Sequence, residues 1–162
     1  MHTDKLDRFT ALARRALAMS QEEALRLKHS EITSAHLLLG LVRVGNGTAF
    51  QVLRDLQLVP SQIIQAVEHA MGRGEHRPAG RPLLTESSKH AIEYAVDEAR
   101  LAGDSAIGIG HLLLGITRLD STSEEENIAM RVLEALGLTP QRIRAQIERK
   151  AGDGPSAPNP GL

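Results

Sequence analysis

The sequence contains one pentapeptide twice, and this repetition limits the folds that the chain can adopt. Segment 36–40, His-Leu-Leu-Leu-Gly, recurs unchanged as segment 111–115, at an offset of 75 residues. Flanking residues match at the same offset. After five extra residues within 120–127, the matches continue at an offset of 80. Such an internal duplication predicts two copies of one structural unit stacked on each other.

The apolar pattern of each copy predicts four helices. Small or apolar residues recur at helical spacing in a first helix, and they form one face of it in both copies. The second helix is nearly all apolar over 37–42 and 112–116, so we expect it to be central and covered on most sides. Gly40 and Gly115 in mid-helix predict a close helix crossing, because glycine otherwise destabilises a helix by about 1 kcal/mol. A third and a fourth helix are expected to follow in each copy.

The predicted fold is therefore all-α, with two pseudo-symmetric four-helix repeats. We place repeat 1 at residues 1–71 and repeat 2 at 84–150. The intervening 72–83 is rich in glycine, proline and charge and is expected to be a solvated linker, and 151–162 a disordered tail. The acidic insertion within 120–127 is either a tolerated surface loop or a docking site for a basic partner.

Composition excludes several classes of function. A net charge of −1, from 19 basic and 20 acidic residues, makes nucleic acid and anionic membranes poor partners. The chain has no cysteine, which excludes disulfides and thiolate metal sites. It also contains no apolar run of membrane-spanning length and no apolar signal segment at its start. We expect a soluble, cytoplasmic, monomeric protein.

Both copies contain further matches beyond the pentapeptide. Repeat 1 reads Phe9-Thr10, Glu22-Glu23-Ala24, Ile32, His36 to Leu41, Arg43 and Gly45-Asn46-Gly47; repeat 2 reads Thr85, Glu98-Ala99, Ile107-Gly108, His111 to Ile116 and Arg118. This double pattern resembles the Clp repeat domain at the N-terminus of ClpA-type and ClpC-type ring-forming unfoldases, and it is most similar to the ClpC type. The resemblance implies a helical protein-binding module that receives substrates, adaptor proteins and, in the ClpC type, segments carrying phosphoarginine.

An ATPase ring follows this domain in the family, but no Gly-x-x-x-x-Gly-Lys-Ser/Thr phosphate loop occurs in this sequence. We therefore expect no enzyme activity. Clp substrates, adaptor proteins or a ClpC-type unfoldase are the expected partners, and recruitment and sequestration remain open. The chain is either a fragment or a free-standing relative, and the composition of its C-terminus favours the latter.

One family feature is missing from both repeats. The family's Thr-Glu-His segment offers a carboxylate to the phosphoarginine guanidinium, whereas this chain has Ala35 and Gly110 at the acidic position. A charge-assisted carboxylate contact is worth about 1.5–3 kcal/mol. Recognition of phosphoarginine is therefore not expected. Ser34 is expected to cap the central helix of repeat 1, while Ile109 has no hydroxyl for that role.

The paired histidines His36 and His111 permit two readings. They could be metal ligands or general bases of a small metal-binding or hydrolytic protein, or each could hold a helix start together by hydrogen bonding. We favour the structural role, because no second histidine or carboxylate lies three or four residues away. No metal or cofactor is expected. The acidic pairs 22–23 and 97–98 are expected to lie on solvated helix faces with one buried partner each.

Candidate docking residues lie near the seam between the two first helices. Leu6, Phe9 and Leu84 are the apolar candidates, although Phe9 could instead pack the interface between the repeats. The polar candidates are Thr10, Arg81, Thr85 and Glu93, and Thr10 and Thr85 are also predicted helix caps. Arginines 73, 77 and 81 of the linker are expected to be solvated, or else to bind an acidic peptide or a phosphate.

Overall fold

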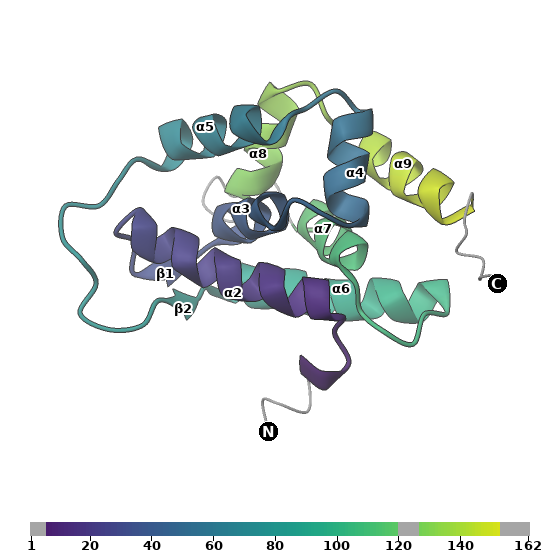
Figure 1. Cartoon of the computed structure of the whole chain (residues 1–162), viewed down its shortest axis with the longest axis horizontal. Helices are drawn as coiled ribbons and strands as arrows, with labels where there is room; N and C mark the ends of the chain where they lie inside the picture. The colour runs from purple at the N-terminus through teal and green to yellow at the C-terminus, as the bar shows by residue number, and fades with distance from the viewer. Residues whose placement is uncertain (1–5, 120–126, 153–162) are drawn as a thin grey trace.

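The computed structural model describes residues 6–119 and 127–152, and it is built mainly from helices (Figure 1). Repeat 1 forms α2 (Ala11–Arg26), α3 (Ser34–Val44), α4 (Thr48–Asp55) and α5 (Pro60–Met71). Repeat 2 forms α6 (Glu86–Ala102), α7 (Ile109–Thr117), α8 (Ile128–Ala135) and α9 (Pro140–Gly152). Corresponding helices begin 75 residues apart in the first two pairs and 80 in the last two. The predicted all-α fold of two four-helix repeats is confirmed.

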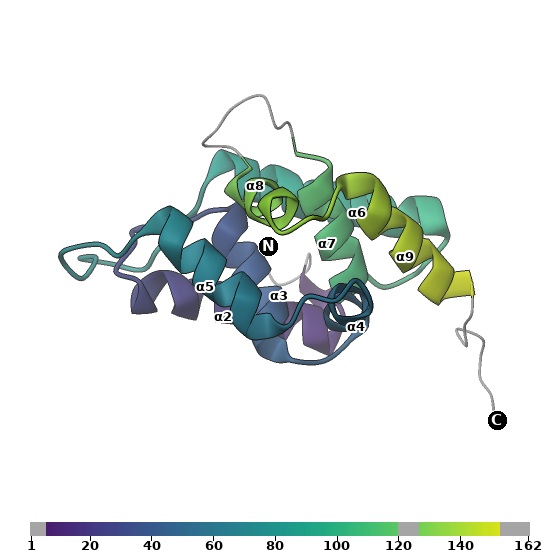
Figure 2. The same ribbon diagram turned by 90° about the horizontal axis from the view of Figure 1, so that it is seen from above.

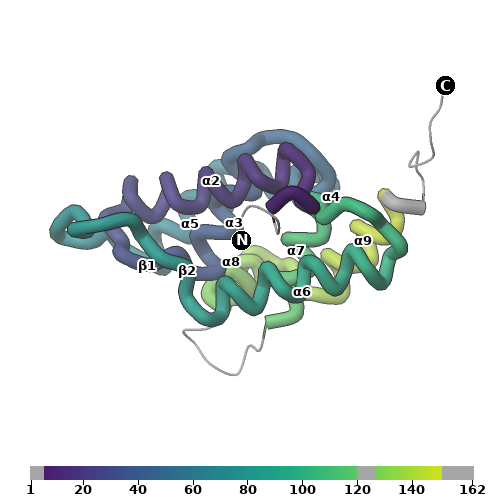
Figure 3. Tube along the Cα trace, turned by 90° about the horizontal axis from the view of Figure 1, so that it is seen from below, coloured from purple at the N-terminus to yellow at the C-terminus, as the bar shows by residue number. Residues whose placement is uncertain are grey.

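The helices form three layers. In Figure 1, α3 and α7 occupy the middle, α2 and α6 lie below them, and the four remaining helices lie above. Figure 2 shows that upper layer, in which α4 and α5 of repeat 1 lie among α8 and α9 of repeat 2. Figure 3, from below, shows α2 and α6 on either side of the molecule's midline. Each layer contains the corresponding helices of both repeats, as expected for two copies related by a pseudo-twofold rotation.

The central helices are buried because the other layers enclose them. Every residue from Ser34 to Val42 of α3 is buried, and most of α7 is as well. At Gly40 a Cβ atom would lie 2.3 Å from the carbonyl oxygen of Ala16, and at Gly115 one would lie 2.2 Å from that of Ala91. Both glycines therefore mark crossings of backbone against backbone, which confirms the prediction made from their position in mid-helix.

Two short strands, absent from the sequence prediction, join the start of repeat 2 to repeat 1. Strand β1 (Glu31–Ile32) pairs in parallel with β2 (Leu83–Leu84), and the Thr85 N–H donates to the Ile32 carbonyl at 3.1 Å. We call this contact the second stitch, because it attaches the start of repeat 2. Leu83, assigned to the linker from the sequence, is thus the first residue of β2.

An equivalent contact joins the start of repeat 1 to repeat 2. Phe9 forms a parallel bridge with Ile107, and the Thr10 N–H donates to the Ile107 carbonyl at 2.9 Å. We call this contact the first stitch. Its residues correspond to those of the second stitch at the offset of 75. Each repeat therefore begins by bonding to the other repeat, so the two halves interlock.

Threonine side chains cap the helices that follow the stitches. The Thr10 hydroxyl accepts a hydrogen bond from the Ala13 N–H, and the Thr85 hydroxyl accepts one from the Ser88 N–H, each at 3.1 Å. Both predicted caps are confirmed. The Ser88 hydroxyl adds a buried hydrogen bond to the Ile32 carbonyl, at 2.5 Å.

Helices α4 and α8 each pack against the other repeat, α4 on α7 and α9, α8 on α3 and α5. The prediction that Ser34 caps α3 is wrong. The cap is Thr33, one residue earlier, and the buried Ser34 hydroxyl instead accepts a hydrogen bond from Ala129 N–H of α8 at 3.2 Å. In repeat 2 the cap position is Gly108, which has no side chain to accept a hydrogen bond. Ser34 therefore joins the repeats.

The remaining sequence predictions concern the connecting segments. The Arg73 guanidinium donates to the carbonyl of Arg26 at 3.1 Å, so this end of the linker lies against α2, while Arg77 and Arg81 are exposed. Residues 120–126 of the insertion and 153–162 of the tail lie outside the described residues. Within the described part of the chain, no helix is long and apolar enough to cross a bilayer.

Candidate functional site

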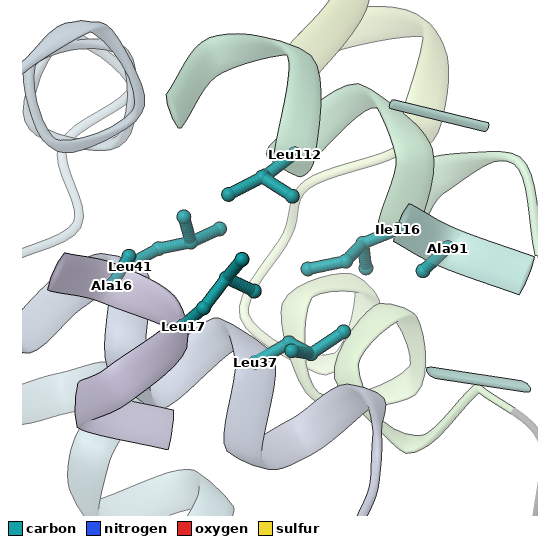
Figure 4. A pocket seen from close by; sticks show the side chains of 7 residues that line it. All are labelled: Ala16, Leu17, Leu37, Leu41, Ala91, Leu112 and Ile116. Atoms are coloured by element: carbon teal, nitrogen blue, oxygen red, sulfur yellow. The ribbon is translucent and has the colours of Figure 1, made fainter. Parts of the chain in front are cut away.

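A small apolar groove lies on the seam between the repeats. Its walls come from α2 and α6, and its floor comes from α3 and α7 (Figure 4). The groove is shallow, with a cavity volume of only about 10 Å³. The lining side chains are Ala16, Leu17, Leu37, Leu41, Ala91, Leu112 and Ile116.

This composition determines what the groove can bind. Every lining side chain is apolar, so the groove has no group that could act as a nucleophile, a general base or a metal ligand. Its cavity volume is about that of a single water molecule and is far below the range of about 300–1,000 Å³ that is usual for small-molecule sites. The groove is therefore an apolar surface depression that another polypeptide could contact, and it has no open cavity for a small molecule. Leu17 is half-buried, and the other lining residues are buried.

The three apolar candidates from the sequence lie in different surroundings. Phe9 is only 4% exposed, so the prediction that it is an exposed docking residue is wrong and its alternative, packing at the interface between the repeats, is correct. Leu84 is half-buried in the second stitch, and Leu6 is 40% exposed. The neighbouring Leu83 is 70% exposed, and it lies in the stretch that the sequence pattern assigns to the linker.

The polar candidates divide into two groups. Thr10 and Thr85 are engaged as helix caps and in the stitches, so their hydroxyls already have partners. Arg81, ahead of β2, and Glu93, on α6, are exposed. The exposed pair remains available to a partner, and whether either residue binds one stays a prediction.

The positions that lack the family carboxylate have little free space around them. Ala35 is fully buried. At Gly110 a Cβ atom would lie 3.3 Å from the methyl group of Thr48, on α4. Neither position therefore provides an acceptor for a guanidinium group, and neither has open space for a longer side chain without movement of its neighbour.

The two histidines hold the starts of the central helices. The Thr33 N–H donates to Nδ1 of His36, and the Gly108 N–H donates to Nδ1 of His111, each at 2.9 Å. Nε2 of His36 lies 2.8 Å from Nδ1 of His29, and Nε2 of His111 lies 2.9 Å from a carboxylate oxygen of Asp104. Both nitrogens of each ring therefore have hydrogen-bonding partners, which is the arrangement that a structural role requires.

The acidic pairs contribute one buried carboxylate each, as predicted. In repeat 1, Glu23 contacts Arg26 at 2.7 Å and Arg43 at 3.3 Å. Burial acts to raise the Glu23 pKa, but the hydrogen bond from Arg26 and the charges of both arginines outweigh it and lower this pKa. Arg26 also binds Glu68 of α5 at 2.7 Å. The cluster therefore fastens α2 to α3 and α5.

Repeat 2 builds the same cluster with an arginine from a different helix. Glu98 contacts Arg144 of α9 at 2.7 Å and Arg118 at 3.3 Å. The hydrogen bond from Arg144 lowers the Glu98 pKa, and the charges of both arginines lower it further. Burial acts in the opposite direction but is outweighed. Arg118 also lies 4.5 Å from the centre of the Tyr94 ring. Through these contacts, Glu23 and Glu98 each hold helices of their repeat together.

Residues 8–124 match the Clp repeat (R) N-terminal domain family, and the chain belongs to this family. It is 42% identical over 149 residues to the chaperone protein ClpB of Oceanobacillus iheyensis. This alignment covers 92% of this chain and 18% of ClpB. It is also 42% identical over 145 residues to ClpC/MecB of Bacillus subtilis, a negative regulator of genetic competence. This second alignment covers 90% of this chain and 17% of that protein. The chain therefore spans less than a fifth of these relatives.

Solved N-terminal domains share the fold. The N-terminal domain of the chaperone ClpD from Arabidopsis thaliana superposes with a TM-score of 0.73 at 24% identity, covering 89% of this chain and 94% of that one. A ClpV N-domain solved in complex with a VipB peptide gives a TM-score of 0.66 at 15% identity, covering 90% and 91%. At these identities the likeness establishes the fold alone.

Proposed function

We propose that this chain is a non-catalytic protein-binding module of the Clp chaperone–protease system. It binds substrate proteins or adaptors and either delivers them to a ClpC-type unfoldase or withholds them from it. The apolar groove between the interlocked repeats is the observation that carries this proposal. An apolar side chain of the partner packs over the groove against Leu17, the half-buried residue at its margin.

Membership of the Clp repeat family and the ClpV N-domain solved with a VipB peptide support this function. The clusters that might have suggested chemistry are accounted for structurally, since His36, His111, Glu23 and Glu98 all have partners that hold helices together. Among the described residues, no group of three histidine or acidic side chains is placed to hold a metal ion. The metal-binding or hydrolytic alternative is therefore not favoured by any contact in the site.

Recognition in this chain does not depend on phosphoarginine under this proposal. The guanidinium group of such a ligand would find Ala35 and Gly110 in place of the acidic residues, and the loss of a charge-assisted contact costs about 1.5–3 kcal/mol, roughly tenfold or more in affinity. Free phosphoarginine is therefore expected not to compete with an unmodified client.

Leu17→Glu tests the groove directly, because a carboxylate at this half-buried position would place charge at the groove without removing a fully buried side chain. Ala18→Glu is the matched control, since Ala18 is exposed on the same helix and does not line the groove. We expect Leu17→Glu to weaken binding of a fluorescently labelled unfolded protein at least tenfold in an anisotropy titration, and Ala18→Glu to leave it unchanged. Equal binding by all three proteins would contradict the assignment of the groove.

A degradation assay separates the two modes of action. The chain is added in trans to a ClpC-type unfoldase and its protease, with the same labelled client. Faster degradation indicates recruitment, slower degradation indicates sequestration, and Leu17→Glu should suppress either effect. No change in rate at saturating concentrations of the native chain would argue against any role with that unfoldase.

A further inference from the structure

The two repeats fasten their central helices with the same histidine but with different partners. His36 contacts His29 in repeat 1, whereas His111 contacts Asp104 in repeat 2. Positions 29 and 104 correspond at the offset of 75, so the two arrangements are symmetry-related versions of one contact. The difference is chemical, because a carboxylate is an acceptor at neutral and mildly acidic pH, whereas an imidazole becomes a donor on both nitrogens when protonated.

Backbone hydrogen bonds determine where the protons of the pair lie. The Thr33 N–H can only donate, so Nδ1 of His36 is the acceptor and the proton of the neutral ring is on Nε2. That proton is donated to Nδ1 of His29, 2.8 Å away. The contact therefore needs an unprotonated Nδ1 on His29. Protonation of His29 there would bring two N–H groups face to face.

The surroundings of His36 also disfavour its protonation. The residue is fully buried, and this burial, together with the positive charge that His29 can acquire, lowers the pKa of His36 from 6.5 to about 4. Glu23 of α2 opposes the shift, but it is already paired with Arg26 and Arg43. The other acidic, basic and histidine side chains on the elements that contact α3 are exposed or paired. They are Arg14, Arg15 and Glu22 of α2, Glu31 of β1, Arg54 and Asp55 of α4, Glu68 and His69 of α5, Glu86, Lys89, His90, Glu93, Asp97, Glu98 and Arg100 of α6, His111 of α7, and Arg131 and Glu134 of α8.

The histidine pair closes a loop that carries the second stitch. His29 directly precedes Ser30, whose carbonyl accepts the Leu83 N–H at 3.3 Å. His36 holds Thr33, which follows Ile32, the acceptor for both the Thr85 N–H and the Ser88 hydroxyl. The acceptors of the second stitch therefore lie between the two histidines in the chain.

We propose that the His29–His36 pair is an acid-sensitive latch on the second stitch. Protonation breaks the contact, frees the loop between the two rings, and loosens the start of repeat 2 from repeat 1. The corresponding contact beside the first stitch persists under the same conditions, because the Asp104 carboxylate accepts from Nε2 of His111 whether or not that ring is protonated. Mild acid thus opens one side of the interlocked pair before the other.

Amide hydrogen exchange on the full chain, followed by NMR at pH 7 and pH 5, tests the latch, with rates corrected for intrinsic exchange. The Thr85 amide reports on the second stitch and the Thr10 amide on the first. A pKa lowered from 6.5 to about 4 predicts that protection at Thr85 falls about 20-fold over this interval. Protection at Thr10 should fall much less. An equal fall at both amides would overturn the proposal.

The duplication supplies two matched variants. His29→Asp gives repeat 1 the arrangement of repeat 2, and the acid-induced fall at Thr85 should shrink toward that at Thr10. Asp104→His makes the reverse change, and Thr10 should then become acid-sensitive. If Thr85 in His29→Asp loses protection as it does in the native chain, the histidine pair is not the sensor. That comparison needs only the first variant to fold.

Discussion

Replacement of Gly40 or Gly115 by alanine tests whether the close crossings of the first and central helices set the packing of the molecule. At Gly40 the new Cβ atom would lie 2.3 Å from the carbonyl oxygen of Ala16, and an ordinary contact begins near 3.4 Å. Helix α2 must therefore retreat by about 1 Å. Neither clashing partner can rotate away, because the nearest atoms at both crossings belong to the backbone.

The magnitude follows from two opposed effects. Overpacking a well-packed core costs about 1–3 kcal/mol, and rigid backbone neighbours place these sites at the upper end. Alanine favours the helix over glycine by about 1 kcal/mol. We expect a net loss of about 2 kcal/mol at each site, which corresponds to a fall of roughly 4–8 °C in Tm for a chain of this size.

Urea denaturation monitored by circular dichroism measures both variants. Gly80→Ala is the control, because no atom lies within 4 Å of its added Cβ and its φ lies outside the left-handed region. This control should remain within about 0.5 kcal/mol of the native chain. The reasoning fails if Gly40→Ala and Gly115→Ala are as stable as the control.

Two further substitutions test contacts that join helices. Ser34→Ala leaves the Ala129 N–H buried without its acceptor and should cost about 1–2 kcal/mol in urea denaturation, whereas Thr117→Ala, which removes a hydroxyl bonded within its own helix, should cost less. Glu98→Ala should cost about 1–2 kcal/mol, because Arg118 and Arg144 lose their shared partner but remain partly hydrated. The lowered Glu98 pKa means that its contribution is present above the ordinary value of 4.5 and is lost as the pH falls below it, so the difference between native and variant should vanish in acid.

The fold was predictable because the duplication and the helical periodicity agree. The buried central helices, the threonine caps and the glycine crossings all followed from local patterns. The cap of α3 was misplaced by one residue, because adjacent Thr33 and Ser34 both carry hydroxyls and only the three-dimensional structure shows that Ser34 bonds to Ala129. Helix ends are commonly uncertain by one or two residues.

The site was less predictable because it depends on contacts between distant parts of the chain. Phe9 is buried where its backbone pairs with Ile107, 98 positions later, and nothing adjacent in the sequence indicates this pairing. Arg144 reaches Glu98 from α9, and no counterpart exists in repeat 1, where residue 64 is isoleucine. The groove joins four helices of both repeats, so its lining could be recognised from the sequence only as apolar stripes.

The reciprocal stitches have a consequence for how this chain can be divided. The contacts between the halves are those that a symmetric dimer of one ancestral repeat would make, with each N-terminal segment exchanged onto its neighbour. A backbone cut at the exposed Gly80 should therefore leave two fragments that remain associated, while either fragment made alone would lack the surface that buries its central helix. The covalent link ensures that the two repeats are present in equal number, and the exchanged segments hold the two repeats together.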